Sequence, residues 1–306
     1  MSESNPPESL PGPPESLDPA LRPRRSVLYM PGANERALEK AKSIPADALI
    51  LDLEDAVAPD AKPAARERVA QAAGSGEYGH REVTIRVNGL GTEWHAADLR
   101  AAAAAGPAAV VVPKIGSAAD VHAIERALES GGAPEHTMIW AMLETPAAMF
   151  AAQQIAAASD RLSVLVMGTN DLANELHAEH VPGRAPLLAG LGLALLAARA
   201  EGKVILDGVY NDVKDLAGFE AECTQGRQLG FDGKTLIHPG QVEPCNRVFA
   251  PTPAQIEESR AVLAAWAQAL AEGRGVATVN GRMIENLHVD NARRILTLVN
   301  SLSGID

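Results

Sequence analysis

The sequence contains few of the residues that stabilise disulfide-rich or nucleic-acid-binding proteins. Its 306 residues include two cysteines, Cys223 and Cys245, whose spacing fits neither a disulfide framework nor a zinc motif. Aromatic residues are scarce, the net charge is −12 and no basic stripe is present, so nucleic acid is not an expected partner. An anionic ligand is still possible, because local Arg and Lys side chains can form a positive pocket. The low cysteine content favours a reducing, cytoplasmic compartment.

Long hydrophobic runs are also missing. No apolar run reaches about 18 residues, so no membrane span and no membrane partner are expected. The first residues lack the basic-then-apolar order of a signal peptide. Residues 1–23 are rich in Pro, Ser and Glu and are predicted to be disordered, since such a segment buries little apolar area. The remaining chain is long enough for one large domain.

Eight short apolar segments follow this N-terminal stretch. Their near-continuous hydrophobicity is typical of parallel strands that are buried on both faces. The predicted strands are Val27–Met30, Ala48–Leu53, Val83–Val87, Ala108–Val112, Met138–Leu143, Leu162–Met167, Val204–Val209 and Thr235–Ile237.

Helical stretches separate these strands, and the alternation predicts an α/β fold with right-handed crossovers. The predicted helices are Asn34–Lys42, Pro63–Ala73, Ala96–Ala105, Ala118–Leu128, Pro146–Ala158, Pro186–Ala200 and Val213–Leu229. Eight units over residues 24–250 favour a closed (β/α)₈ TIM barrel, for which about 250 residues is usual. A doubly wound open sheet is the alternative, but the turn at residues 30–34 lacks the glycine-rich dinucleotide fingerprint.

The pattern changes after the eighth unit. Residues 251–306 contain two predicted helices, Ala254–Glu272 and Leu287–Leu302, with a short segment, Val276–Gly281, between them. We interpret this region as a C-terminal helical extension that covers the barrel mouth or exchanges with a neighbouring subunit. The simpler alternative is a packing helix pair with no part in chemistry.

Two carboxylates stand just past consecutive predicted strands. Glu144 follows the fifth strand and Asp171 the sixth, 27 residues apart, and in a barrel the ends of such strands are neighbours. Two carboxylates there can share a hard divalent cation such as Mg²⁺, with Mn²⁺ as a possible substitute. Each alone is equally well explained by the preference of carboxylates for helix N-termini.

Other charges follow the second, third and fourth strands. Asp52, Glu54 and Asp55 would repel one another and favour a nearby cation. Arg86 ends an apolar strand and needs an anionic partner, which could be this acidic cluster or a substrate. Lys114 could form a Schiff base, although a carboxylate-rich rim favours metal chemistry.

The sequence resembles a known enzyme family through six motifs in order. They are Arg25-Ser26-Val27-Leu28-Tyr29-Met30-Pro31-Gly32, Leu51-Asp52-Leu53-Glu54-Asp55-Ala56-Val57, Arg86-Val87-Asn88, Pro113-Lys114, Leu143-Glu144-Thr145 and Gly233-Lys234-Thr235-Leu236-Ile237-His238-Pro239. Together they are similar to the citrate lyase β-subunit-like CoA-ester lyases of the HpcH/HpaI aldolase family, over about residues 24–300.

The resemblance implies a Mg²⁺-dependent lyase. Such an enzyme reversibly cleaves a 3-hydroxyacyl-CoA such as malyl-CoA or citramalyl-CoA to acetyl-CoA or propionyl-CoA and a 2-oxoacid. It implies that Glu144 and Asp171 bind the metal and that Arg86 binds the 2-oxoacid portion, with Glu54 and Asp55 beside it among the catalytic candidates. The positions implied for binding of the CoA ester are Tyr29, Arg25, Arg36, Lys40, Ile237 and His238.

The chain departs from the family near its C-terminus. There the family places a catalytic aspartate that a neighbouring subunit donates, which implies a homotrimer or hexamer, whereas this chain has Glu285. Glu285 keeps the carboxylate and adds a methylene, and we expect it to exchange a proton at the thioester α-carbon. The alternatives are a malyl-CoA thioesterase on the same scaffold, the β subunit of a multi-subunit citrate lyase, and a ligand-binding relative without activity.

A histidine pair is a weaker candidate. His177 and His180 could bind a metal, but no third ligand lies nearby in the sequence, and we interpret them as surface residues.

Overall fold

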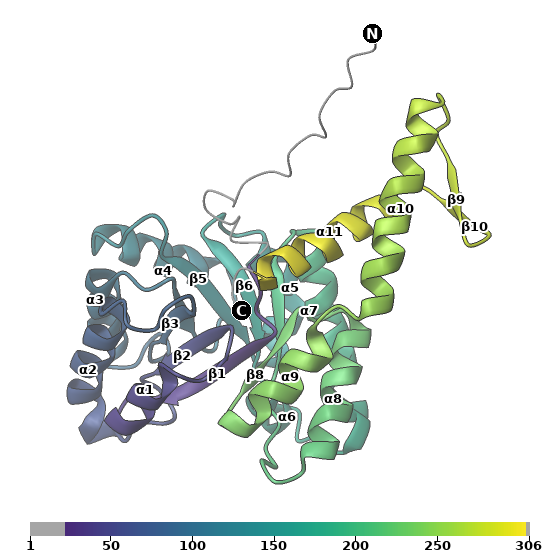
Figure 1. Ribbon diagram of the computed structural model, residues 1–306. Coiled ribbons are helices and arrows are strands. Elements are labelled where there is room, and N and C mark those ends of the chain that lie inside the picture. The colour runs from purple at the N-terminus through teal and green to yellow at the C-terminus, as the bar shows by residue number, and fades with distance from the viewer. Residues whose placement is uncertain (1–21, 304–306) are drawn as a thin grey trace. The chain divides into compact units, whose positions relative to one another are not determined.

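The computed structural model describes residues 22–303. Eight parallel strands form a closed barrel in sequence order, and β8 pairs with β1, which confirms the predicted TIM barrel (Figure 1). The prediction for residues 1–23 falls almost entirely outside the described residues. The strands are β1 (Ser26–Pro31), β2 (Ala48–Asp52), β3 (Glu82–Arg86), β4 (Ala109–Val112), β5 (Met138–Leu143), β6 (Leu162–Met167), β7 (Val204–Asp207) and β8 (Gly233–Leu236).

Alternate residues of each strand fill the inside of the barrel. Val27, Ile50, Val111, Trp140 and Val166 belong to one buried cluster that the eight strands enclose. The residues between them face outward and form a second, larger cluster with the helices. Because successive side chains of a strand point to opposite faces, both faces need apolar residues, which explains the near-continuous hydrophobic runs.

Helices surround the strands as the outer layer of the barrel (Figure 1). They are α1 (Glu35–Ala41), α2 (Lys62–Gly74), α3 (His95–Ala105), α4 (Ala118–Ser130), α5 (Pro146–Ala156), α6 (Thr169–Glu175), α7 (Leu188–Ala200), α8 (Leu216–Leu229) and α9 (Val242–Phe249), with single turns η2 (Pro59–Ala61), η3 (Pro182–Leu187) and η4 (Pro239–Gln241). Thr145 caps α5 through its hydroxyl, which accepts the backbone N–H of Ala148.

Most predicted boundaries differ from the structure by one or two residues, larger differences occur around β7, α7 and α8, and two helices were not predicted. β7 ends at Asp207, and α8 begins at Leu216 because Asp215 caps it. The predicted helix from Pro186 begins within η3 and continues as α7 from Leu188, and the backbone just before Pro186 is not helical, since Gly183 and Arg184 have positive φ. The short α6 and α9 were missed. This matters for the site, because α6 carries Asp171.

One stretch, Pro182–Ala200, has the length and mean hydropathy of a membrane-crossing helix. It spans η3 and α7, and residues such as Leu191, Ala194 and Ala198 of α7 are buried in the barrel core. Its apolar composition is therefore explained by its place in the outer layer of the barrel.

Arg24–Ala250 and the chain from Pro251 form separate compact units. In the C-terminal unit, α10 (Pro253–Ala271) and α11 (Asn286–Ser303) are joined by a hairpin of β9 (Ala277–Val279) and β10 (Arg282–Ile284). Asn280 and Gly281 both have positive φ in its two-residue turn, as a type I′ turn requires. Val262, Trp266, Ile284 and Val289 are among the residues of its small apolar core.

Candidate active site

The structure brings Glu144 and Asp171 to the same end of the barrel. Glu144 follows β5 and is 1% exposed, and its Oε1 accepts the backbone N–H of Lys114 at 2.6 Å. Asp171 lies in the first turn of α6 and is partly exposed. Burial, together with the negative charges of Asp171 and Glu54, raises the pKa of Glu144 to about 8. A buried carboxylate that lies near a second carboxylate is ionised more readily when a cation binds beside it.

Glycine at position 168 makes room for the Glu144 side chain. Gly168 follows β6, and a Cβ there would lie 2.2 Å from Glu144 Oε2 and 2.4 Å from Glu144 Cβ. Any larger residue would displace the carboxylate. This requirement was not anticipated from the sequence, since Gly168 stands in an ordinary strand-to-helix turn.

The acidic cluster after β2 binds Arg86. The Arg86 guanidinium contacts both oxygens of Asp52, at 2.6 and 2.7 Å, and Glu54 Oε2 at 2.8 Å, whereas Asp55 is more distant at 3.4 Å. Asp52 is 1% exposed and also accepts the backbone N–H groups of Glu54 and Ala56. The sequence left two possible partners for Arg86, the acidic cluster and a substrate. In the structure Arg86 pairs with the acidic cluster.

Glu54 lies at the barrel mouth, the end of the barrel that carries Glu144 and Asp171, and its carboxyl group has a raised pKa. Burial raises its pKa to about 7, against the opposing effect of Arg86 and with a further increase from Asp55 and Asp52. Such a carboxyl group exchanges protons near neutral pH and suits general acid–base catalysis.

A buried lysine fixes the turn that carries Glu54. The Lys62 ammonium donates to the carbonyls of Leu53 and Glu54 and to Asn88 Oδ1, at 2.7–2.9 Å. It also lies 5.0 Å from the Trp94 ring centroid. Sequence analysis missed Lys62, because a lysine that begins a helix is usually solvated.

Tyr29 and Met142 form the floor of the mouth. Tyr29 points inward from β1, and its ring lies under the Arg86 guanidinium at 4.8 Å. Its hydroxyl is 3.9 Å from the sulfur of Met142 on β5, the strand on the opposite side of the eight-stranded barrel. Contact across the barrel closes the space below the charged groups.

Lys114 follows β4 and contacts both acidic groups. Its ammonium lies 3.7 Å from Asp171 and 4.0 Å from Glu54. Partial burial alone would lower its pKa, but Glu54, Asp171 and Glu144 raise it above the ordinary value. A protonated ammonium is a poor nucleophile, which argues against the Schiff-base alternative.

Arg25 is not part of this group. It precedes β1, at the N-terminal end of the strand, and its guanidinium pairs with Asp47 at 2.8 Å just before β2. The opposite strand ends carry Glu144, Asp171 and Arg86, so Arg25 lies apart from these residues, and its role in CoA binding stays a prediction. Its place in the motif reflects the closure of β1 against β2 and β8.

The other residues implied for CoA binding lie near the correct strand ends. Arg36 and Lys40 are exposed one turn apart on α1, directly after β1. Ile237 follows β8 and is 42% exposed, and His238 caps η4 by accepting the backbone N–H of Gly240. Their role in CoA binding stays a prediction.

Glu285 belongs to the C-terminal unit. It precedes α11 with an exposed side chain, and its backbone N–H donates to the His288 ring. Its proton-transfer role stays a prediction. His177 and His180 are exposed, in agreement with their interpretation as surface residues.

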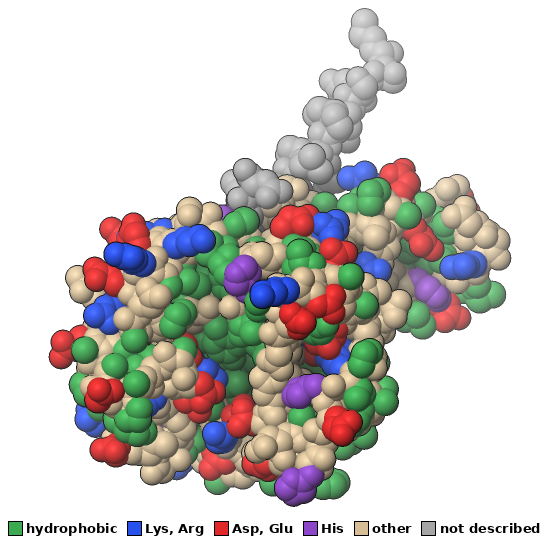
Figure 2. All heavy atoms as spheres, turned by 90° about the horizontal axis from the view of Figure 1, so that it is seen from below, with side chains coloured by type: hydrophobic (Ala, Val, Ile, Leu, Met, Phe, Trp, Pro, Cys, Tyr) green, Lys and Arg blue, Asp and Glu red, His purple; other side chains and the backbone are tan. Residues whose placement is uncertain are grey.

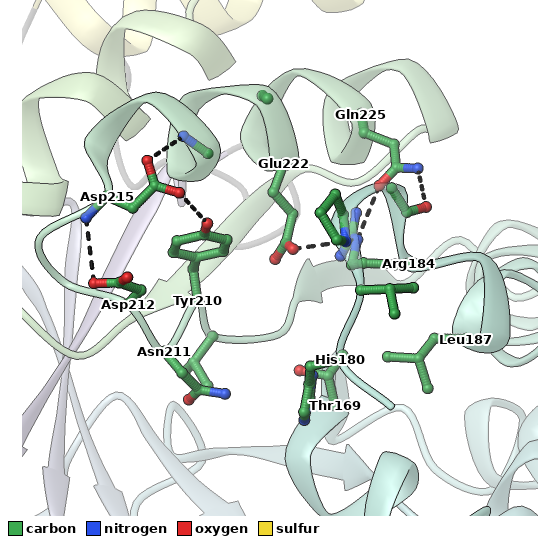
Figure 3. A pocket seen from close by; sticks show the side chains of 16 residues that line it. Thr169, His180, Arg184, Leu187, Tyr210, Asn211, Asp212, Asp215, Glu222 and Gln225 are labelled. Carbon is green, nitrogen blue, oxygen red and sulfur yellow. Dashed lines mark hydrogen bonds and ion pairs between the residues drawn. The ribbon is translucent and has the colours of Figure 1, made fainter. Parts of the chain in front are cut away.

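A cavity of about 460 Å³ lies between the segments that follow β6 and β7. Figure 3 shows Arg184 beside Glu222 and Gln225 in its wall, and Tyr210 directed at Asp215. Arg184 Nη1 contacts Asp207 at 2.6 Å, and Lys234 bridges Asp207 and Glu222. These four charges neutralise one another within the fold.

The carboxylates of Glu144 and Asp171 are suited to bind a hard cation that keeps open coordination positions. Among residues 22–303, no group of three or more His, Cys, Asp or Glu side chains is arranged to hold a metal. Two carboxylates leave coordination positions for water or substrate oxygens, which is the usual arrangement for Mg²⁺. The face of the molecule in Figure 2 is hollowed, with hydrophobic, acidic and basic side chains around the hollow.

Comparisons with known proteins find relatives that match almost the whole chain. The chain is 50% identical over 282 residues to a (3S)-malyl-CoA thioesterase of Cereibacter sphaeroides (92% of this chain, 96% of the relative). It is 38% identical over 289 residues to the citrate lyase β subunit of Escherichia coli (93% and 95%).

Solved structures are also similar to this chain. CitE from Mycobacterium tuberculosis, in complex with magnesium, acetoacetate and coenzyme A, is 29% identical with a TM-score of 0.72 (90% of this chain, 97% of that one). A citrate lyase β subunit from the same organism, complexed with oxaloacetate and magnesium, is 31% identical with a TM-score of 0.65 (76% and 99%). The family model described as HpcH/HpaI aldolase/citrate lyase matches residues 25–239. The protein is therefore an enzyme of the HpcH/HpaI aldolase/citrate lyase family.

Proposed function

We propose that the protein is a Mg²⁺-dependent enzyme that hydrolyses the thioester of a 3-hydroxyacyl-CoA of the malyl-CoA type. The observation that carries this proposal is the combination of two neighbouring carboxylates, the buried Glu144 and the partly exposed Asp171, with Glu54, a largely buried carboxyl group whose pKa is raised to about 7. The relative at 50% identity, named a (3S)-malyl-CoA thioesterase, supports hydrolysis.

Carbon–carbon cleavage is the second candidate. The family and the citrate lyase β relatives favour it, and it would release acetyl-CoA or propionyl-CoA and a 2-oxoacid. In that reaction the substrate hydroxyl loses its proton, and the bond between the hydroxyl-bearing carbon and the thioester α-carbon breaks. The electron pair stays on the α-carbon, which Glu285 of a neighbouring subunit would protonate in a homotrimer or hexamer.

The residues of the mouth divide the work of hydrolysis. Glu144 and Asp171 would hold Mg²⁺, which supplies a Lewis acid that polarises substrate oxygens. In its ionised form, Glu54 accepts a proton from a water molecule as the water adds to the thioester carbonyl carbon. The carbon–sulfur bond then breaks, and CoA leaves as the thiol after protonation. Tyr29 and Met142 close the floor beneath the reacting groups.

Product analysis tests the proposal. Purified protein is incubated with Mg²⁺ and malyl-CoA, β-methylmalyl-CoA or citramalyl-CoA. Hydrolysis yields free CoA and the intact hydroxyacid, whereas cleavage of malyl-CoA yields acetyl-CoA and glyoxylate. No Mg²⁺-dependent turnover with any of the three substrates would contradict both candidates.

Mg²⁺ binding should depend on pH through Glu144. A metal must displace the proton from this carboxyl, whose pKa is about 8, so affinity should rise up to about tenfold per pH unit between pH 6 and 8. Calorimetry in two buffers with different ionisation enthalpies should show release of up to about one proton per Mg²⁺ near pH 7. A pH-independent affinity over this range would contradict the assignment of Glu144.

The same proton links pH to stability of the metal-free protein. The folded chain holds it up to about pH 8, while an unfolded glutamate releases it near 4.5. The contribution of this group to stability is therefore fully present below pH 4.5 and is lost as the pH rises to about 8.

Gly168→Ala should impair metal binding while leaving the barrel folded. The new methyl group would overlap the Glu144 side chain, so we expect Mg²⁺ affinity to fall by roughly 10- to 100-fold, the usual effect of disturbing ligand orientation. Gly192→Ala in α7 is the matched control, because a Cβ there meets nothing within 4 Å. Equal Mg²⁺ affinities for the two variants would show that the close contact is not required.

A further inference from the structure

Lys114 has a backbone conformation that is rare for a residue with a side chain. Its φ is +55°, in the left-handed region, although it is neither Gly nor Asn. This conformation accompanies a backbone N–H that donates to Glu144 and a side chain that extends to Asp171. One residue thus contacts both members of the carboxylate pair. Strained backbone at a functional site persists only where the surrounding contacts maintain it.

Two cations pair with acidic side chains at this end of the barrel, and they are held very differently. Arg86 is 8% exposed, is bound at 2.6–2.8 Å by Asp52 and Glu54, and lies on the Tyr29 ring. The Lys114 side chain is 53% exposed, and its ion pairs at 3.7 and 4.0 Å are longer than hydrogen bonds. Arg86 is therefore fixed by the protein, and the Lys114 ammonium is free to change partners.

The excess of negative charge at the barrel mouth favours a cationic side chain that can change partners. Asp52, Glu54, Asp55, Glu144 and Asp171 face Arg86 and Lys114, which leaves three formal negative charges in excess when all are ionised, and the Lys62 ammonium on the turn that carries Glu54 offsets one of them. An anionic substrate would be repelled. A divalent cation bound by Glu144 and Asp171 would offset most of this excess negative charge. Because it would pair with Asp171, the Lys114 ammonium would lose its nearer partner.

We propose that Lys114 is a substrate-binding residue whose ammonium neutralises Asp171 in the metal-free protein and pairs with the carboxylate of the substrate once a divalent cation is bound. The ligand class is a small 2-hydroxy or 2-oxo carboxylate, alone or as the acyl portion of a thioester. This inference rests on the proposed function. It gives the substrate carboxylate a cationic partner other than Arg86, whose N–H groups already bind the acidic cluster.

Binding measurements separate the ammonium from the strained backbone. Lys114→Met keeps a side chain of similar length without charge, and Lys114→Gly removes the ammonium while relieving the left-handed strain and keeping the backbone N–H. Lys114→Arg retains the charge. Lys214→Met, at an exposed lysine after β7, controls for a general loss of positive charge. Calorimetry measures Mg²⁺ binding first, and then binding of malate and glyoxylate to the Mg²⁺-loaded protein.

We expect Lys114→Met and Lys114→Gly to bind Mg²⁺ at least as tightly as the unmodified protein, because a competitor for Asp171 is gone. Both should bind the carboxylates roughly tenfold or more weakly, as for loss of a charged hydrogen bond. Lys114→Arg and Lys214→Met should remain close to the unmodified protein.

Two results would overturn the role of Lys114. One is carboxylate binding in Lys114→Met equal to that of the unmodified protein, and the other is weakened Mg²⁺ binding in both Lys114→Met and Lys114→Gly, which indicates a structural role. Failure of the unmodified protein to bind either carboxylate with Mg²⁺ would instead count against the proposed function, so the two failures are distinguishable.

Discussion

Glu144→Gln and Asp171→Asn are each expected to abolish Mg²⁺-dependent turnover. Both changes keep the size of the side chain and remove one of two carboxylates at the proposed metal site. A bound metal supplies several kcal/mol of transition-state stabilisation, so loss of about 4 kcal/mol corresponds to roughly a 10³-fold fall in kcat/KM. Calorimetry should show that Mg²⁺ binding is lost in parallel.

The stability of Glu144→Gln provides a second measurement. Because the buried Glu144 carboxylate is unfavourable without a cation, the metal-free variant should unfold at a temperature no lower than the unmodified protein above pH 8. Glu175→Gln, an exposed glutamate at the end of α6, is the control and should keep normal turnover. Near-normal activity with Mg²⁺ in either active-site variant would remove the metal assignment.

The barrel could be predicted from the sequence because its strands are buried on both faces. Runs such as Ala109–Val112 and Met138–Leu143 are apolar without interruption, and helices of sufficient length separate the strands. Boundaries were less accurate where local backbone geometry decides them. The irregular backbone of η3, ahead of α7, depends on positive φ at Gly183 and Arg184, which composition does not reveal.

The polar groups of the mouth could be predicted as a set, but their partners could not. Carboxylates directly after apolar strands indicated Glu144, Asp171 and the acidic cluster, because buried charge is costly without a function or a partner. Whether Arg86 faces the cluster or a substrate depends on side-chain geometry at the barrel end. Lys62 and Met142 were missed for the same reason, since each acts through a contact with a distant part of the chain.

Arg25 shows the limit of motif comparison. It lies within the first family motif, four residues before Tyr29, and the resemblance assigned both to the same ligand. A strand of this length separates its two ends by about 3.3 Å per residue, so the two residues lie toward opposite ends of the barrel. A single motif can thus contain residues from both ends of the barrel.

Arg86→Met should be the most destabilising single change at the mouth. It would leave Asp52, which is 1% exposed, without its bidentate partner and next to Glu54. Loss of one partner from a buried ion pair costs about 3–5 kcal/mol, which urea unfolding would detect. Arg247→Met, which breaks exposed pairs with Glu243 and Glu220, should lower the free energy of unfolding far less, because exposed ion pairs contribute little to stability.

The double variant Asp52→Asn/Arg86→Met distinguishes structural from chemical roles of the arginine. Asparagine is neutral and can still accept a backbone N–H in the turn after β2, so most of the lost stability should return. If Arg86 also binds substrate, turnover should stay at least tenfold below that of the unmodified protein despite restored folding. Recovery of activity together with stability would show that Arg86 serves only as the counterion of the acidic cluster, and that Lys114 and the bound cation alone attract the substrate carboxylate.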